Sequence, residues 1–203
     1  MNILAYAPDG QTIATGGDSG KVKVWSTYSG FCFVTFTDHS APISSVPFAK
    51  QGSVPFSASL DGIVRAYDLI RYRNFRTFAP PSPVRFSCLA VDPPGEVVAA
   101  GSTDTCEVFL WSVQTGKLLD VMAGHTGPVS PLAFSPSGAD QLASGSWDKT
   151  MQVWNIFGRS GAVEPFSLNS DGSSSRSART ARRSWFRLWM GKSHSLTSRT
   201  ASR

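Results

Sequence analysis

The sequence has no long hydrophobic run, few cysteines and few charged residues. None of its apolar stretches approaches the roughly 20 residues that a bilayer-spanning helix needs, and its start, 1–10, lacks the basic region of a signal peptide. Its three cysteines (Cys32, Cys88 and Cys106) are widely spaced without a Cys-x-x-Cys pair. This spacing argues against a disulfide framework or a zinc site and favours a reducing compartment. Only 16% of the 203 residues are charged, whereas 41% are hydrophobic, enough for a buried core.

The net excess of positive charge is confined to the end of the chain. The whole sequence carries a formal net charge of +5. Residues 1–157 contain 10 Lys and Arg against 12 Asp and Glu, while residues 158–203 contain 9 against 2, together with 12 serines. A basic protein often binds nucleic acid, but here that inference applies to the last segment alone, and the rest of the chain is slightly acidic.

A repeat of about 43 residues runs through the first part of the chain. Four short segments each end in an aromatic residue, and these aromatics are spaced by 42, 44 and 43 residues (Trp25, Tyr67, Trp111 and Trp154). Turn glycines keep the same period, with spacings of 42, 43 and 43 (Gly10, Gly52, Gly95 and Gly138). Two unrelated residue types that share one period indicate a repeat architecture.

Each repeat reads as several short strands. In the fourth, 129–134 is apolar, a Pro/Gly turn follows, and 151–154 alternates as a half-buried strand does. Four strands in 40–45 residues, with an aromatic closing the third strand, are typical of a propeller blade. Over residues 3–157 the chain resembles the WD-repeat family. The resemblance implies an all-β fold of about four four-stranded antiparallel blades forming an incomplete ring, with blades at 3–36, 43–78, 85–122 and 129–157. Because rings of this family usually have seven blades, we expect the chain to be part of a longer one.

Two repeats contain a recurring set of polar residues. The fourth repeat has His125, Ser144, Asp148 and Trp154, and the second has His39, Ser57, Asp61 and Tyr67 at nearly the same offsets. In the WD-repeat family, residues of these types form a buried hydrogen-bonded chain within the blade, and the resemblance implies that role here. The first and third repeats lack the complete set.

Serine, histidine and aspartate are also the residues of a hydrolase triad. However, the triplet recurs from repeat to repeat and the sequence has no G-x-S-x-G turn to expose a nucleophile. We therefore predict that the protein is not an enzyme and that it has no catalytic residue, metal, cofactor or small-molecule substrate.

Longer stretches narrow the resemblance to one WD-repeat protein. They are 58–68, 71–78, 86–92 and 146–150. This resemblance implies a non-enzymatic scaffold in the nucleus and nucleolus, within the small-subunit processome that acts in pre-ribosomal RNA processing and ribosome biogenesis. Its expected partners are other WD-repeat proteins of that assembly, with pre-ribosomal RNA contacted indirectly and no membrane. The alternative is a general protein-interaction module with an RNA-binding basic tail.

One segment of the second repeat is a candidate contact for RNA or a partner. It interleaves arginines with aromatic side chains, a mixture suited to a nucleic-acid backbone and to base stacking; its members are Arg71, Tyr72, Arg73, Phe75 and Arg76. The alternative is an ordinary outer strand with a solvated face.

The repeat stops after Phe157, and two hypotheses describe residues 158–203. One is a disordered Ser/Arg-rich tail that binds RNA or serves as a nuclear address. The other is a change of reading frame after about Asp171, because the codons of Trp189, Met190 and Gly191, read with a two-base offset, encode an apolar residue followed by Asp-Gly. That product would resemble residues 60–62 of the second repeat.

Overall fold

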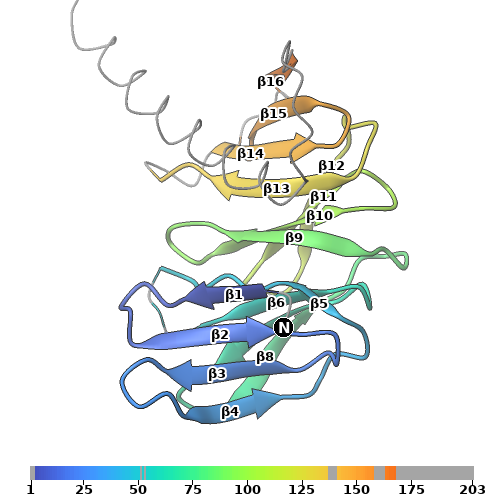
Figure 1. Ribbon diagram of the computed structural model, residues 1–203. Coiled ribbons are helices and arrows are strands. Elements are labelled where there is room, and N and C mark those ends of the chain that lie inside the picture. Colours follow the sequence, from blue (N-terminus) through green and yellow to red (C-terminus); the bar gives the residue numbers. More distant parts are fainter. Residues whose placement is uncertain (1–2, 51, 53, 137–140, 158–162, 168–203) are drawn as a thin grey trace, which may run out of the picture. The chain divides into compact units, whose positions relative to one another are not determined.

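The computed structural model describes residues 3–50, 52, 54–136, 141–157 and 163–167 (Figure 1). The chain divides into two units, Met1–Leu168 and Asn169–Arg203, and every described residue belongs to the first. Within the described residues, sixteen strands form four four-stranded antiparallel sheets and no helix is long and apolar enough to cross a membrane. The expectation of an all-β fold of about four four-stranded antiparallel blades is confirmed. Of the segment 158–203, to which the two tail hypotheses apply, residues 158–162 and 168–203 lie outside this description.

Each sheet, or blade, takes its strands in chain order. Blade one contains β1 (Ile3–Tyr6), β2 (Thr12–Gly16), β3 (Val22–Ser26) and β4 (Cys32–Phe36), and blade two contains β5 (Ile43–Ser45), β6 (Phe56–Ser59), β7 (Val64–Asp68) and β8 (Arg73–Phe78). Blade three contains β9 (Phe86–Val91), β10 (Val97–Ser102), β11 (Val108–Ser112) and β12 (Leu118–Met122), and blade four contains β13 (Val129–Phe134), β14 (Gln141–Ser146), β15 (Thr150–Asn155) and β16 (Val163–Ser167).

The core lies between neighbouring blades. Three clusters of buried hydrophobic residues join blades one and two, two and three, and three and four. Tyr67 from blade two stacks on Phe36 from blade one, with ring centroids 4.2 Å apart. The small residues Ala58, Ala66 and Ala100 lie at the junction of blades two and three, so that two sheets approach closely. Because each sheet buries a face only against its neighbour, the blades stabilise one another as repeats do.

Glycine is required where the turns between second and third strands meet the next blade. At Gly20, with φ +69°, a β-carbon would lie 2.5 Å from the carbonyl oxygen of His39. At Gly62, with φ +80°, it would lie 2.6 Å from that of Val84. In the later blades Cys106 (φ 60°) and Lys149 (φ 66°) occupy left-handed positions in the corresponding turns, where an L side chain is strained.

The fourth sheet continues beyond Phe157, where the sequence predicts the tail to begin. The strand β16 pairs with β15 and completes the sheet. A three-stranded sheet would leave the outer N–H and C=O groups of β15 without partners, which gives the additional strand a physical reason.

Prolines shape the first strands of two blades. In blade two, β5 has only three residues, and Pro47 follows it and accepts a hydrogen bond at its carbonyl from the Phe56 N–H. In blade four, Pro131 lies within β13, where the pairing register with β14 shifts. A proline cannot donate to a strand ladder, so each sits where regular pairing is interrupted.

Candidate functional site

The predicted polar residues of blade four come together as one hydrogen-bonded set. Trp154 on β15 donates through Nε1 to Ser144 Oγ on β14 at 2.7 Å, and Ser144 Oγ lies 2.8 Å from His125 Nε2. On the other side of the ring, His125 Nδ1 lies 3.0 Å from Asp148 Oδ2. The blade-four set (His125, Ser144, Asp148 and Trp154) therefore connects the inter-blade loop to both central strands and to the turn between them.

The chemistry of the donors assigns a direction to these bonds. The Trp154 indole can only donate, so it occupies one acceptor site of Ser144, and the serine hydroxyl is free to donate to His125 Nε2. The ring is then the Nδ1–H tautomer, which donates to Asp148. Every polar group of the set is thus satisfied inside the blade, as buried groups must be.

Asp148 is held as a carboxylate by its surroundings. Although burial raises the pKa of Asp148, the Thr150 hydroxyl and the backbone N–H groups of Thr126 and Thr150 donate to it, and these bonds keep its pKa well below its ordinary value. His125 adds a further hydrogen bond. The ionised acid is a fixed anchor for the loop before blade four.

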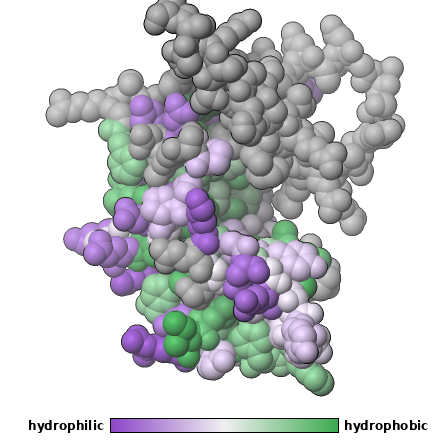
Figure 2. Space-filling view, turned by 90° about the vertical axis from the view of Figure 1, so that its left-hand side faces the viewer, coloured by the Kyte–Doolittle hydropathy of each residue, from purple (hydrophilic) through white to green (hydrophobic). Residues whose placement is uncertain are grey.

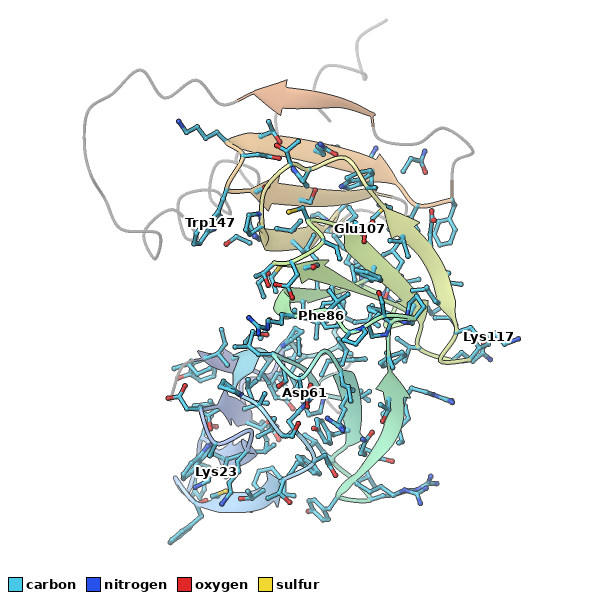
Figure 3. The ribbon with its side chains drawn as sticks, turned by 90° about the vertical axis from the view of Figure 1, so that its right-hand side faces the viewer. Lys23, Asp61, Phe86, Glu107, Lys117 and Trp147 are labelled. Atoms are coloured by element: carbon cyan, nitrogen blue, oxygen red, sulfur yellow. The ribbon has the colours of Figure 1, made fainter. Side chains whose placement is uncertain are left out.

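Blade two contains a second set with a different chemistry. His39 Nε2 lies 2.6 Å from Ser57 Oγ, which is 3.3 Å from the Tyr67 hydroxyl, and His39 Nδ1 lies 2.8 Å from Asp61 Oδ2. Figure 3 labels Asp61 in the turn between β6 and β7. Arg65 on β7 joins this blade-two set (His39, Ser57, Asp61 and Tyr67), with Nη1 2.6 Å from His39 Nδ1 and 3.4 Å from Asp61 Oδ2.

Burial dominates the electrostatics of the blade-two set. Burial lowers the pKa of His39, and its interactions with Asp61 oppose that shift only in part. Burial also raises the pKa of Tyr67 to about 12, against the hydrogen bond with Ser57. For Asp61, burial raises the pKa, but hydrogen bonds from His39 and from the backbone of Ser40 and Ile63 outweigh it and the pKa falls below its usual value. The histidine is therefore neutral and the aspartate ionised at pH 7.

Blades one and three have reduced sets. In blade one, Trp25 Nε1 donates to Thr15 Oγ1 at 2.9 Å. Thr15 pairs with Lys23, which lies two residues before the third-strand tryptophan of blade one. In blade three, the residue that pairs at this position, with Phe109, is Ala100 on β10, which has no hydroxyl group. As a result, Trp111 Nε1 is buried without a hydrogen-bond partner among the described residues. The pair Thr15–Trp25 was missing from the sequence prediction, although the register of the repeat contains the signal for it.

Neither complete set is built for catalysis. Ser57 is 0% exposed and Ser144 is 1% exposed, so a substrate has no access to either hydroxyl. In the described part of the chain no group of three His, Cys, Asp or Glu residues could hold a metal ion. What the sets can do is fix the loop, the second strand and the third strand of one blade to each other.

The Arg/aromatic segment divides into exposed and internal residues. Arg71 is exposed, with Nε 3.9 Å from Asp68 Oδ2, and Arg73 and Phe75 are also exposed on β8. Arg76 instead reaches the neighbouring blade, where its Nη2 donates to the Gln114 carbonyl at 2.9 Å. Arg76 therefore links blades two and three, whereas Arg71, Arg73 and Phe75 are exposed.

Tyr72 completes this segment and contacts the neighbouring blade. It is 57% exposed, and its ring meets that of Phe33 on β4 edge to face, with centroids 6.2 Å apart. Figure 2 shows hydrophobic residues at the surface at the level of blade one, beside hydrophilic ones. Phe33 and Tyr72 thus bring two exposed aromatic rings together where blades one and two meet.

The comparisons with known proteins agree with this architecture. The sequence profile of the WD domain, G-beta repeat family matches residues 2–26, 30–68 and 116–155, and the chain belongs to that family. The profile does not match residues 69–115, which include β9, β10 and β11 of blade three, the blade that lacks the polar set.

The particular relative that the sequence indicated is periodic tryptophan protein 2, and that similarity is confirmed. The chain is 57% identical to the homologue from Dictyostelium discoideum over 77% of its length, 58% identical to that from Mus musculus over 84%, and 58% identical to the protein from Saccharomyces cerevisiae over 84%. It spans only 17%, 18% and 18% of these relatives, respectively.

Proposed function

We propose that the chain is part of a non-enzymatic WD-repeat scaffold that acts in ribosome biogenesis. The observation that carries this proposal is the burial of the Ser–His–Asp chemistry: the only residues with hydrolase character among the described ones are occupied in bracing the blades. A rigid array of short strands then leaves its turns and outer strands to contact other proteins.

The more specific part of the proposal follows the sequence resemblance. We place the scaffold in the small-subunit processome of the nucleolus, where it assists pre-ribosomal RNA processing beside other WD-repeat proteins and contacts the RNA indirectly. The similarity to periodic tryptophan protein 2 supports this assignment.

Depletion and rescue in cells test this function. Loss of the gene product should accumulate unprocessed pre-ribosomal RNA, and the tagged protein should sediment with large pre-ribosomal particles and localise to the nucleolus. A Ser144→Ala variant, checked by circular dichroism for a retained fold, separates the scaffold from an enzyme: a scaffold that still binds the particles should support processing, whereas a hydrolase would lose processing while particle binding persisted. Normal pre-ribosomal RNA after depletion, with the protein absent from the particles, would refute the assignment.

The alternative function is RNA binding through the basic segment 158–203, and its charge favours it. Binding of this kind weakens steeply with salt because it depends on phosphate neutralisation. RNA capture at rising salt, with the full chain and with residues 172–203 deleted, discriminates the two functions: only the tail hypothesis predicts loss of RNA on deletion.

A further inference from the structure

A tyrosine occupies a glycine position in the outer turn of blade two. The turn between the third and fourth strands has Gly30 in blade one (φ +71°) and Gly116 in blade three (φ +74°), each five residues after the third-strand tryptophan. Tyr72 stands at the same offset from Tyr67 and has a φ of 51°. An L residue with a bulky side chain is strained in this conformation, whereas glycine is not.

The contacts of Tyr72 within the fold do not compensate for this backbone strain. The Tyr72 side chain is 57% exposed, and its one ring partner among the described residues, Phe33, is itself partly exposed. Strained residues that persist despite their cost concentrate at functional sites. Cys106 and Lys149 share the left-handed conformation, but Tyr72 is the one bulky aromatic residue of the three, and its exposed ring is available for a contact outside the fold.

The surroundings of Tyr72 define a surface. The turn that contains Tyr72 also exposes Ile70 (80%) before β8. The corresponding turn of blade one, before the strand that holds Phe33, exposes Phe31 (76%). Two arginines flank the tyrosine, and the only acidic side chain in the turn is Asp68, which also accepts the N–H groups of Ile70 and Arg71. We call this surface the rim cluster (Phe31, Phe33, Ile70, Tyr72, Arg71 and Arg73).

We propose that the rim cluster docks an acidic segment of a partner protein, with Tyr72 as its anchor. The proposal rests on the scaffold function above and names the kind of partner. Tyrosine and arginine are the side chains that dominate protein–protein hot spots. The two arginines select a partner of negative charge. RNA fits less well, because nucleic-acid interfaces are strongly positive, whereas the rim cluster has four apolar side chains to two cations on a body with more acidic than basic residues.

The first experiment measures the strain. In urea unfolding of the full chain, Tyr72→Gly should raise the folded-to-unfolded ratio by up to about fivefold, because the left-handed strain that it removes exceeds the freedom that glycine adds to the unfolded chain. Gly30→Tyr is the matched control: a β-carbon at Gly30 has no neighbour within 4 Å, so this change adds strain without a clash and should lower the ratio by a similar factor. A Tyr72→Gly variant less stable than the parent would contradict the idea that the fold gains nothing from the tyrosine.

The second experiment identifies the occupant. The full chain, with Tyr72 replaced by the photo-crosslinker p-benzoylphenylalanine, is irradiated in cells and the attached peptide is sequenced. We expect a segment of another protein rich in Asp and Glu, and its capture should fall at least tenfold when Arg71 and Arg73 are changed to Glu. The control places the crosslinker at Leu119, which is 51% exposed on β12 of blade three.

The outcomes separate this proposal from the proposed function. Crosslinks to RNA, to a second copy, to another part of the same chain or to a segment without acidic residues overturn the docking proposal, as does the absence of any crosslink. Each of these can occur with pre-ribosomal RNA processing intact or impaired. Conversely, an acidic partner with no role in ribosome biogenesis would support the rim cluster and contradict the processome assignment.

Discussion

The buried indole of Trp111 permits a direct measurement of what a blade gains from its polar set. We compare Trp111→Phe in blade three with Trp154→Phe in blade four, since both rings are almost fully buried and both changes remove the same atoms. In blade four the change also breaks the 2.7 Å bond to Ser144, a loss of about 1 kcal/mol. In blade three it removes an N–H group that has no partner among the described residues, which recovers roughly 1 kcal/mol or more.

The two variants should therefore differ by about 2 kcal/mol, with Trp154→Phe the more destabilising. Far-UV circular dichroism in urea measures this difference without using tryptophan fluorescence, and an m value of about 2 kcal/mol/M separates the midpoints by roughly 1 M. A double-mutant cycle of Trp154→Phe with Ser144→Ala should give a coupling energy, whereas none is expected for Trp111→Phe with Ser144→Ala. Equal midpoints for the two tryptophan variants would refute the reasoning.

Two further predictions concern the turns and the buried histidine. Gly62→Ala should destabilise the chain by roughly 2 kcal/mol or more, because Gly62 has a φ of +80° and a β-carbon there would meet the Val84 oxygen. Cys106→Gly, at a φ of 60°, should instead stabilise it by up to about 1 kcal/mol. Urea midpoints of the two variants that move in the same direction would contradict this. Because burial lowers the pKa of His39, the unfolded chain binds the proton more strongly, and the free energy of unfolding should fall as the pH drops below about 6.5. Urea midpoints at pH 7.5 and 5.5 measure this fall, which His39→Gln should reduce, and an unchanged slope in that variant would argue against His39 as its source.

The repeat period predicted most of the fold because it marks positions that every blade must fill. The third-strand aromatic and the turn glycine recur for reasons of packing and backbone conformation, so their spacing alone predicts strands and blades. The partners Arg65 and Thr150 escaped the prediction, since neither belongs to a residue type that recurs at a fixed offset. Arg76 was placed with the exposed segment because a sequence does not reveal that a side chain reaches the Gln114 carbonyl of the next blade. The strand β16 lies past the last periodic residue and therefore had no signal of this kind.

Blade three indicates how a WD repeat can lose its polar set and keep its place in the stack. Trp111 packs against Phe78 of blade two and against Phe86 and Phe109 of its own blade, with ring centroids 5.7–6.1 Å apart. Such aromatic contacts are each worth about 0.5–1.5 kcal/mol beyond burial, so together they can offset the missing bond. The ring of Trp154, in contrast, meets His125 edge to face at 6.4 Å and has Ser144 as its hydrogen-bond acceptor. The same tryptophan position is thus fixed by polar partners in one blade and by aromatic neighbours in another. The stretch 69–115, which contains β9, β10 and β11 of this blade, has no match to the family profile.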